Sequence, residues 1–211
     1  MDRHKVAAVS APAVMPVIMS GVFALARRRL GNRGGYLAGF GAYWLICAGW
    51  AIALIGRRRA GRALLASSPP ANSNSLLQGM LLIWPPLGAV TTRLIPELST
   101  VDRQMVATSA AIAQINAAVE ELFWRETYVE LWPNNPWLGW IWPSIGFALW
   151  HVAPQVIHPS RLGKGRYVAA SLALGLSWGY VAWSTRSIRW TTVSHVVTDA
   201  SGLRNSLYFL E

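Results

Sequence analysis

The sequence predicts an all-α protein: a polytopic bundle of about seven to eight transmembrane helices that forms one integral membrane domain over residues 1–211. Three observations support this prediction. Of the 211 residues, 53% are hydrophobic and only 13% are charged, which does not suit the surface of a soluble domain. The apolar residues fall into runs of about twenty, the length a helix needs to cross a ~30 Å hydrocarbon layer. The arginines lie mainly between those runs.

Seven segments have the length and apolar composition of membrane spans, and dividing one of them would give an eighth. They are residues 7–26, 36–56, 77–96, 105–124, 138–157, 167–184 and 188–203. The first segment resembles a signal peptide, because Ala24-Leu25-Ala26 could be a cleavage site. We interpret it as a helix that stays in the protein, since its apolar stretch is long and three arginines follow it.

The third segment is the least regular. Pro85 and Pro86 interrupt its backbone hydrogen bonding and Arg93 adds a charge, so we expect it to be bent, re-entrant or packed against protein rather than lipid. Two stretches rich in turn residues, 67–75 and 132–137, are predicted as loops and not as domain boundaries. Arginine clusters at both ends of the second span leave the membrane orientation unassigned.

The net charge of +10 does not indicate nucleic-acid binding. The basic residues form clusters at 27–33 and 57–62, directly beside apolar spans, as membrane-surface anchors do. No basic stripe is interleaved with aromatic residues on a polar element. Cys47 is the only cysteine, which excludes an intrachain disulfide and a site of several thiolates. The expected partner is therefore the lipid bilayer, with no nucleic acid.

Candidate functional residues are the ionisable side chains that fall inside predicted spans. They are Glu120, Glu121, Arg125, His151, His195 and Asp199. A charge at mid-bilayer costs roughly 3 kcal/mol on insertion scales, so four unpaired charges would cost ~10 kcal/mol, comparable with the stability of a whole protein. These groups must therefore be paired, lie near the membrane interface, or face a water-filled cavity.

Helical spacing separates the two glutamates. Glu121 and Arg125 are four residues apart and can pair on one face of a helix. Glu120 points about 100° away from Glu121 and has Asn116 one turn before it, which predicts that Glu120 is the freer carboxylate. The alternative is that both glutamates only pair with cations at a helix end near the interface.

The two histidines extend the set. A lone histidine such as His151 in an apolar helix is more often a packing residue with satisfied hydrogen bonds. The last span carries a polar stripe, which indicates a helix that faces a cavity or a hydrogen-bonded seam between helices. The stripe consists of Thr191, His195, Thr198 and Asp199. Two histidines and a glutamate pair on three buried helices form a set suited to activating water.

In this order the residues resemble the CAAX prenyl protease and bacteriocin-processing (CPBP or Abi) family of membrane proteins. That family has three motifs: EExxxR, FxxxH and HxxxN or HxxxD. They correspond here to Glu120-Glu-Leu-Phe-Trp-Arg125, Phe147-Ala-Leu-Trp-His151 and His195-Val-Val-Thr-Asp199. The resemblance covers roughly residues 77–203, the expected protease core, whereas the first two spans, within residues 7–56, are generic membrane helices.

The resemblance implies an intramembrane endopeptidase that hydrolyses peptide bonds of a membrane-associated peptide or protein, with no metal or other cofactor. It implies that Glu120 and His151 activate water. It further implies that His195 and Asp199 assist in stabilising the oxyanion. Glu121 and Arg125 would be the supporting pair.

Two positions depart from the family pattern. Glu126 stands where many members have glycine after the arginine, and we expect it to affect how the helix ends. Asp199 stands where the better-understood members have asparagine, and an ionised carboxylate only accepts hydrogen bonds. We therefore expect Asp199 either to orient His195 or to be kept protonated by burial.

Other functions remain open at this point. A zinc-dependent membrane protease would use similar residues, although the helical HExxH spacing is absent. A non-catalytic binding or immunity protein of the same fold is a second alternative, and a proton-coupled transporter, for which no inverted repeat is visible, is a third. The small size and the Arg-rich, Lys-poor composition favour a bacterial protein of the cytoplasmic (inner) membrane. Neither the substrate nor the oligomeric state follows from the sequence.

Overall fold

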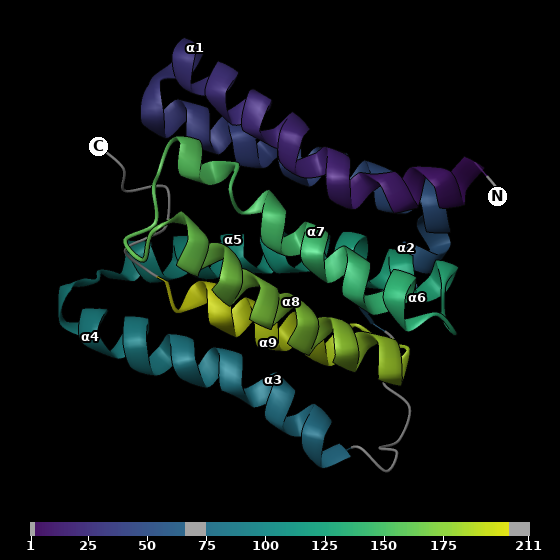
Figure 1. Ribbon diagram of the computed structural model, residues 1–211. Helices are drawn as coiled ribbons and strands as arrows, with labels where there is room; N and C mark the ends of the chain where they lie inside the picture. Colours follow the sequence, from purple (N-terminus) through teal and green to yellow (C-terminus); the bar gives the residue numbers. More distant parts are fainter. Residues whose placement is uncertain (1–2, 66–74, 203–211) are drawn as a thin grey trace.

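The computed structural model describes residues 3–65 and 75–202, and within these residues it contains helices and no strands (Figure 1). The prediction of an all-α protein is confirmed. The α-helices are α1 (Arg3–Ile55), α2 (Arg57–Ala63), α3 (Ser75–Ala89), α4 (Ile95–Glu97), α5 (Arg103–Glu121), α6 (Thr127–Leu131), α7 (Trp142–Trp150), α8 (Lys164–Thr185) and α9 (Arg189–Ala200). Three π-helical turns, Val90–Leu94, Leu122–Glu126 and Trp137–Ile141, join or precede them, and 3-10 turns cover Leu98–Thr100 and Pro154–Val156.

Helix α1 is a hairpin of two arms, which correspond to the first two predicted spans (Figure 1). The chain reverses at Gly31, whose φ of 73° lies in the left-handed region that glycine adopts without steric cost. The arms then pack closely, because a Cβ on Gly39 would lie only 2.5 Å from the Phe23 ring. Two glycines therefore allow this stretch to fold back on itself.

The third predicted span takes one of the three expected forms, a helix packed against protein. It is one helical run from Ser75 to Thr100 that contains the π-helical turn, and α3 packs against α8 and α9. Pro86 has no N–H, so it leaves the carbonyl of Leu82 without its helical donor. The hydroxyl of Ser194 on α9 donates to that carbonyl at 2.7 Å. A neighbouring helix thus satisfies the backbone group that the proline exposes.

The predicted span 138–157 ends earlier than expected. Helix α7 stops at Trp150, His151 caps it, and turns with a 3-10 segment follow through Val156. Pro154 explains the end, because it cannot donate to the carbonyl one turn before it. The predicted loop 132–137 is found at residues 132–135, with Pro136 already helical. The predicted loop 67–75 lies outside the described residues except for Ser75, which begins α3.

By length and composition, α1 is the one described helix that qualifies as a candidate membrane span. The prediction of seven separate spans is not confirmed by this criterion. The other helices are shorter, divided by π turns or less apolar. Helix α9, with 12 residues, is only ~18 Å long at 1.5 Å per residue.

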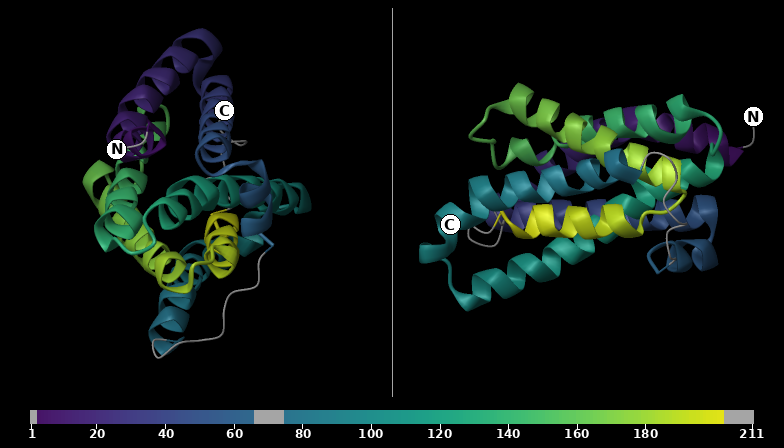
Figure 2. Two further views of the ribbon diagram at one scale, coloured as in Figure 1. Left: turned by 90° about the vertical axis from the view of Figure 1, so that its right-hand side faces the viewer. Right: turned by 90° about the horizontal axis from the view of Figure 1, so that it is seen from below.

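The helices that carry the three motifs lie side by side. Helix α9 packs against both α5 and α3, and α7 packs between the α1 hairpin and α8 (Figures 1 and 2). The largest buried apolar cluster joins residues of α1, the π turn after α5, α7 and α8. The carboxyl ends of α5 and α7 and the whole of α9 thereby face a common interior region.

Candidate active site

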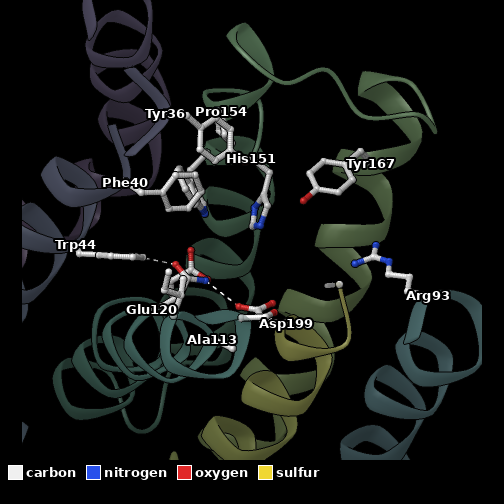
Figure 3. A pocket seen from close by; sticks show the side chains of 15 residues that line it. Tyr36, Phe40, Trp44, Arg93, Ala113, Glu120, His151, Pro154, Tyr167 and Asp199 are labelled. Atoms are coloured by element: carbon white, nitrogen blue, oxygen red, sulfur yellow. Dashed lines mark hydrogen bonds between the residues drawn. The ribbon is translucent and has the colours of Figure 1, made fainter. Parts of the chain in front are cut away.

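The predicted site residues gather around a cavity of about 170 Å³. Glu120 comes from the last turn of α5, His151 from the end of α7 and Asp199 from the end of α9, and all three line the cavity (Figure 3). Three aromatic side chains of α1 close the cavity on another side. They are Tyr36, Phe40 and Trp44. Three elements far apart in the sequence therefore bring two carboxylates and a histidine to one cavity.

Glu120, predicted as the freer of the two carboxylates, lines this cavity whereas Glu121 does not, but its side chain has several partners. Its Oε1 accepts a hydrogen bond from the Tyr43 hydroxyl at 2.7 Å, and its Oε2 accepts one from Asn116 at 3.3 Å. The Nε2 atom of His195 lies 3.3 Å from the same Oε2. Helical spacing predicted the neighbour on the same helix, Asn116, but not the partners on α1 and α9. The side chain is oriented by three contacts.

Tyr43 is a site residue that the sequence analysis did not identify. Its ring stacks on Trp150, with centroids 3.6 Å apart and planes 12° apart, and its hydroxyl accepts from the indole N–H of Trp124 at 2.8 Å. The hydroxyl hydrogen is thereby left to point at Glu120. The second arm of α1, described above as a generic helix, thus contributes directly to the site. A signal was present: Tyr36, Phe40, Tyr43 and Trp44 follow helical i, i+4, i+7, i+8 spacing.

Asn116 connects the two carboxylates of the cavity. The indole N–H of Trp44 donates to its Oδ1 at 2.8 Å, and because an indole nitrogen only donates, this contact fixes which end of the amide is oxygen. The amide NH2 then faces Glu120 at 3.3 Å and Asp199 Oδ2 at 2.9 Å. This amide, one turn before Glu120, holds both acids in place.

The Glu121–Arg125 pair predicted from helical spacing is confirmed. Arg125 Nη1 lies 3.3 Å from Glu121 Oε1, and the two side chains are 1% and 0% exposed. Glu121 also accepts from Thr191 at 2.7 Å. The guanidinium carbon lies 4.1 Å from the centroid of the Phe147 ring, a cation–π contact between the first and second motifs. This pair lies behind the cavity and does not line it.

His151 presents one ring nitrogen to the cavity. Its Nδ1 lies 2.6 Å from the carbonyl oxygen of Phe147. A carbonyl only accepts, so Nδ1 carries the hydrogen and the neutral ring has its lone pair on Nε2. Tyr167 stands beside the ring, with centroids 5.7 Å apart. The arrangement leaves Nε2 as a proton acceptor toward the cavity.

His195 is buried behind Glu120 and Asp199 and does not line the cavity. Its ring stacks on Trp178 with centroids 4.2 Å apart, and its Nδ1 lies 2.9 Å from Glu121 Oε1. Its Nε2 faces Glu120 at 3.3 Å and Asp199 Oδ2 at 3.5 Å. Both ring nitrogens therefore face carboxylate oxygens, and a doubly protonated imidazolium satisfies all of these contacts.

Glu126, the first departure from the family pattern, lies outside the site. It belongs to the π turn that follows α5 and pairs with Arg59 at 2.7 Å. Its carboxylate is buried and ties α2 to the end of α5. Among residues 3–65 and 75–202, no group of three or more His, Cys, Asp or Glu side chains has the geometry to hold a metal ion.

The fold and the site define a helical protein with a buried acid–base constellation at the edge of a small cavity. Comparison with known families agrees with this class. Residues 102–201 match the model of the family described as type II CAAX prenyl endopeptidase Rce1-like. The resemblance drawn from the three motifs is confirmed, because the matched segment, 100 of 211 residues, contains all three of them. Neither the curated proteins nor the solved structures gave a match.

The matched family is one of endopeptidases, enzymes that hydrolyse peptide bonds. The matched segment begins at Asp102, which caps α5 by accepting from the N–H of Met105 at 2.7 Å. It ends at the close of α9 and so contains all three motifs.

Tyr43 and Trp44 of α1 lie outside this segment. Both nevertheless donate hydrogen bonds to side chains of that segment: Tyr43 donates to Glu120, and Trp44 donates to Asn116.

Proposed function

We propose that this protein is an intramembrane endopeptidase in which Glu120 and His151 activate a water molecule against the peptide bond of a membrane-associated peptide or protein. The observation that carries the proposal is that Glu120 and His151, from two separate motifs, line the same cavity (Figure 3). The match to an endopeptidase family over the motif-bearing segment supports it.

The proposed reaction needs only groups of this chain and water. Water in the cavity is held between the Glu120 carboxylate and His151 Nε2. The Glu120 carboxylate removes a proton from this water as its oxygen adds to the scissile carbonyl. The proton then passes to the leaving amine as the bond to carbon breaks. Tyr43 and Asn116 keep the Glu120 carboxylate aimed at the cavity, because they hold one oxygen each.

His195 and Asp199 are proposed to assist the oxyanion that forms on the scissile carbonyl. Asp199 lines the cavity, and His195 stands directly behind it. In the substrate-free geometry His195 Nε2 faces two carboxylate oxygens, so donation to an oxyanion requires one of these contacts to be exchanged. Glu121 and Arg125 support the site, because Glu121 contacts His195 Nδ1 on the side away from the cavity and Arg125 pairs with Glu121.

We further propose that the chain is embedded in a membrane as a polytopic bundle. Large apolar side chains are exposed on several helices, as expected for contact with lipid rather than water. Examples are Val17, Leu45, Leu76 and Ile83, with exposed fractions of 73%, 77%, 78% and 61%. The bacterial cytoplasmic membrane is the proposed location, and its peptides or proteins are the proposed substrates.

The cell-based test of this function is a comparison of membrane peptides between strains that carry the wild-type protein and the Glu120→Ala variant. Uncleaved precursors of a protease should accumulate in the variant strain while the variant protein stays folded. A non-catalytic binding or immunity protein would keep its phenotype. Loss of cleavage on treatment with chelators, followed by zinc-specific rescue, would instead support a zinc-dependent membrane protease.

Replacing Tyr43 with phenylalanine is expected to lower kcat by about tenfold while leaving KM nearly unchanged. The change removes one hydrogen bond that orients Glu120, and the stacked ring on Trp150 stays. The matched control is Tyr128→Phe, which removes an equally buried hydroxyl that donates to the carbonyl of Ala8 at 2.8 Å, away from the site. Equal losses of kcat in both variants would contradict a positioning role for Tyr43.

Replacing Asp199 with asparagine is expected to retain activity, within about tenfold of wild type. The amide oxygen can still accept from Asn116, and the amide NH2 can donate to an oxyanion. Asp199→Ala removes both the hydrogen-bond acceptor and the donor, so it should lower kcat/KM by about a hundredfold. The measurement is kcat/KM for one peptide with the three proteins. Complete loss in the Asp199→Asn protein would instead favour a role in orienting His195.

A further inference from the structure

A second, larger cavity, called the outer cavity below, adjoins the candidate active site and shares part of its lining. It has a volume of about 430 Å³ and is lined by the end of the α3 helical run and by the turns that follow α7. Four residues line both cavities: Tyr36, Arg93, Pro154 and Tyr167. The two cavities therefore meet, and a bound peptide could extend from Glu120 into the outer cavity.

The outer cavity carries mainly positive charge. Its lining contains Arg93 and Arg161, against one acidic residue, Glu97. At its edge Arg27 donates to the carbonyl of Val156 at 3.0 Å, which places another cation nearby. The inner cavity, by contrast, contains the carboxylates of Glu120 and Asp199. The electrostatic character thus changes sign along the path.

Arg93 stands where the two cavities meet. Among the described residues it is the one lysine or arginine that lines the inner cavity. It belongs to the π-helical turn Val90–Leu94, and Figure 3 shows its guanidinium directed into the cavity, on the side where Tyr167 lies. Within residues 3–65 and 75–202 no carboxylate forms an ion pair with it at 4 Å or less. A charged group in such a position usually has a functional partner.

We propose that Arg93 binds a carboxylate of the substrate and thereby selects peptides that carry one beside the cleaved bond. This inference rests on the proposed function, because it assigns a specificity residue to the same site. A guanidinium donates two parallel hydrogen bonds to a carboxylate, which gives both attraction and a fixed orientation. The carboxylate is either an acidic side chain or the carboxyl terminus of the peptide, and both have the same chemistry.

The alternative role for Arg93 is that of a counter-charge for Asp199 and Glu120. The two roles differ in what they predict. A counter-charge would affect every substrate in the same way, since it acts on the enzyme. A carboxylate-binding residue would affect only peptides that carry the carboxylate. A comparison across matched peptides therefore separates them.

The test uses the full chain in lipid nanodiscs with the substitution Glu120→Gln, so that binding is read without hydrolysis. The binding of three fluorescent apolar peptides is compared by anisotropy. Two have the same sequence, one with a free carboxyl terminus and one amidated, and the third is the amidated peptide with a single aspartate placed near its end. We expect one of the two carboxylate peptides to bind at least about tenfold more tightly than the plain amide.

Adding Arg93→Gln should abolish that preference by weakening only the carboxylate peptide, and Arg93→Lys should keep part of it. The control is Arg166→Gln, an exposed cation on α8 that lines neither cavity. Equal weakening of all three peptides by Arg93→Gln, the same effect from Arg166→Gln, or no preference in the parent protein would each overturn the proposal.

The outcome is separable from that of the proposed function. If binding shows the Arg93-dependent preference but the protein with Glu120 restored never hydrolyses these peptides, the proposed endopeptidase function is contradicted. The carboxylate site is then still supported. Hydrolysis of the peptides without any preference for a carboxylate would contradict the carboxylate site and leave the endopeptidase function supported. Preference for the aspartate peptide would identify an acidic side chain as the ligand of Arg93, and preference for the peptide with a free carboxyl terminus would identify the chain terminus.

Discussion

Replacing Glu120 with glutamine is expected to lower kcat for peptide hydrolysis by about a hundredfold to ten-thousandfold. Glutamine keeps the shape of the side chain, and its amide oxygen can still accept from the Tyr43 hydroxyl. It cannot take a proton from water. The loss should therefore fall on the chemical step, and KM should change little.

The measurement is kcat and KM for a fluorogenic membrane peptide, together with a thermal unfolding curve for each protein. Glu130→Gln is the matched control, because that carboxylate pairs with Arg59 on α2 and is 43% exposed, away from the cavity. It should keep wild-type kcat. A Glu120→Gln protein with the unfolding temperature and the kcat of wild type would exclude Glu120 as the base.

Replacing Arg125 with methionine is expected to destabilise the protein by about 3 kcal/mol, the largest stability effect that the site predicts. The guanidinium is fully buried beside Glu121 and over the Phe147 ring, so its removal leaves the buried Glu121 carboxylate without its arginine partner. Methionine fills much of the volume, which confines the loss mainly to the charge.

Unfolding free energies in a single lipid or detergent system test this prediction. Arg189→Met is the control. Because Arg189 is exposed, this substitution should lower the free energy of unfolding by less than about 0.5 kcal/mol. The double variant Glu121→Gln/Arg125→Met should recover part of the loss, because neither charge then stays buried alone. If Arg125→Met were no less stable than Arg189→Met, the buried pair would have no structural role.

Local spacing predicted the parts of the site that one helix determines. The Glu121–Arg125 pair was predictable because four residues make a little more than one helical turn, and the structure shows that pair at 3.3 Å. The polar stripe on the last helix was predictable for the same reason: its Thr191 and His195 both meet Glu121. Ionisable groups in apolar segments were sufficient to locate these candidates.

Contacts between helices could not be predicted in this way. Tyr43 and Glu120 are 77 residues apart, and nothing in the helical period of either segment places one beside the other. The same holds for Asn116 and Asp199, 83 residues apart. These contacts depend on the hairpin at Gly31 and on how α9 packs against α5. Helical spacing therefore separated Glu120 from the Glu121–Arg125 pair but could not identify the partners of Glu120 on other helices.

Helix boundaries and bends were the other source of error. Two prolines left the third span bent, re-entrant or packed against protein, and the structure shows the last of these. Ser194 on α9 supplies the hydrogen that the Leu82 carbonyl lacks, so the helix continues. His151 was placed inside a span and instead ends α7, with Pro154 just beyond it. Its position at a helix end is what lets the ring reach the cavity. Such compensations come from tertiary packing and leave little trace in local sequence.

The most direct test of the central claim uses purified protein in lipid nanodiscs together with peptides extracted from a bacterial membrane. Mass spectrometry then compares the new peptide termini formed by the wild type, Glu120→Gln and Glu130→Gln proteins. We predict that the same new termini appear with wild type and Glu130→Gln and are missing with Glu120→Gln. Identical termini from all three proteins, formed at the same rate, would contradict the assignment of Glu120 as the group that activates water.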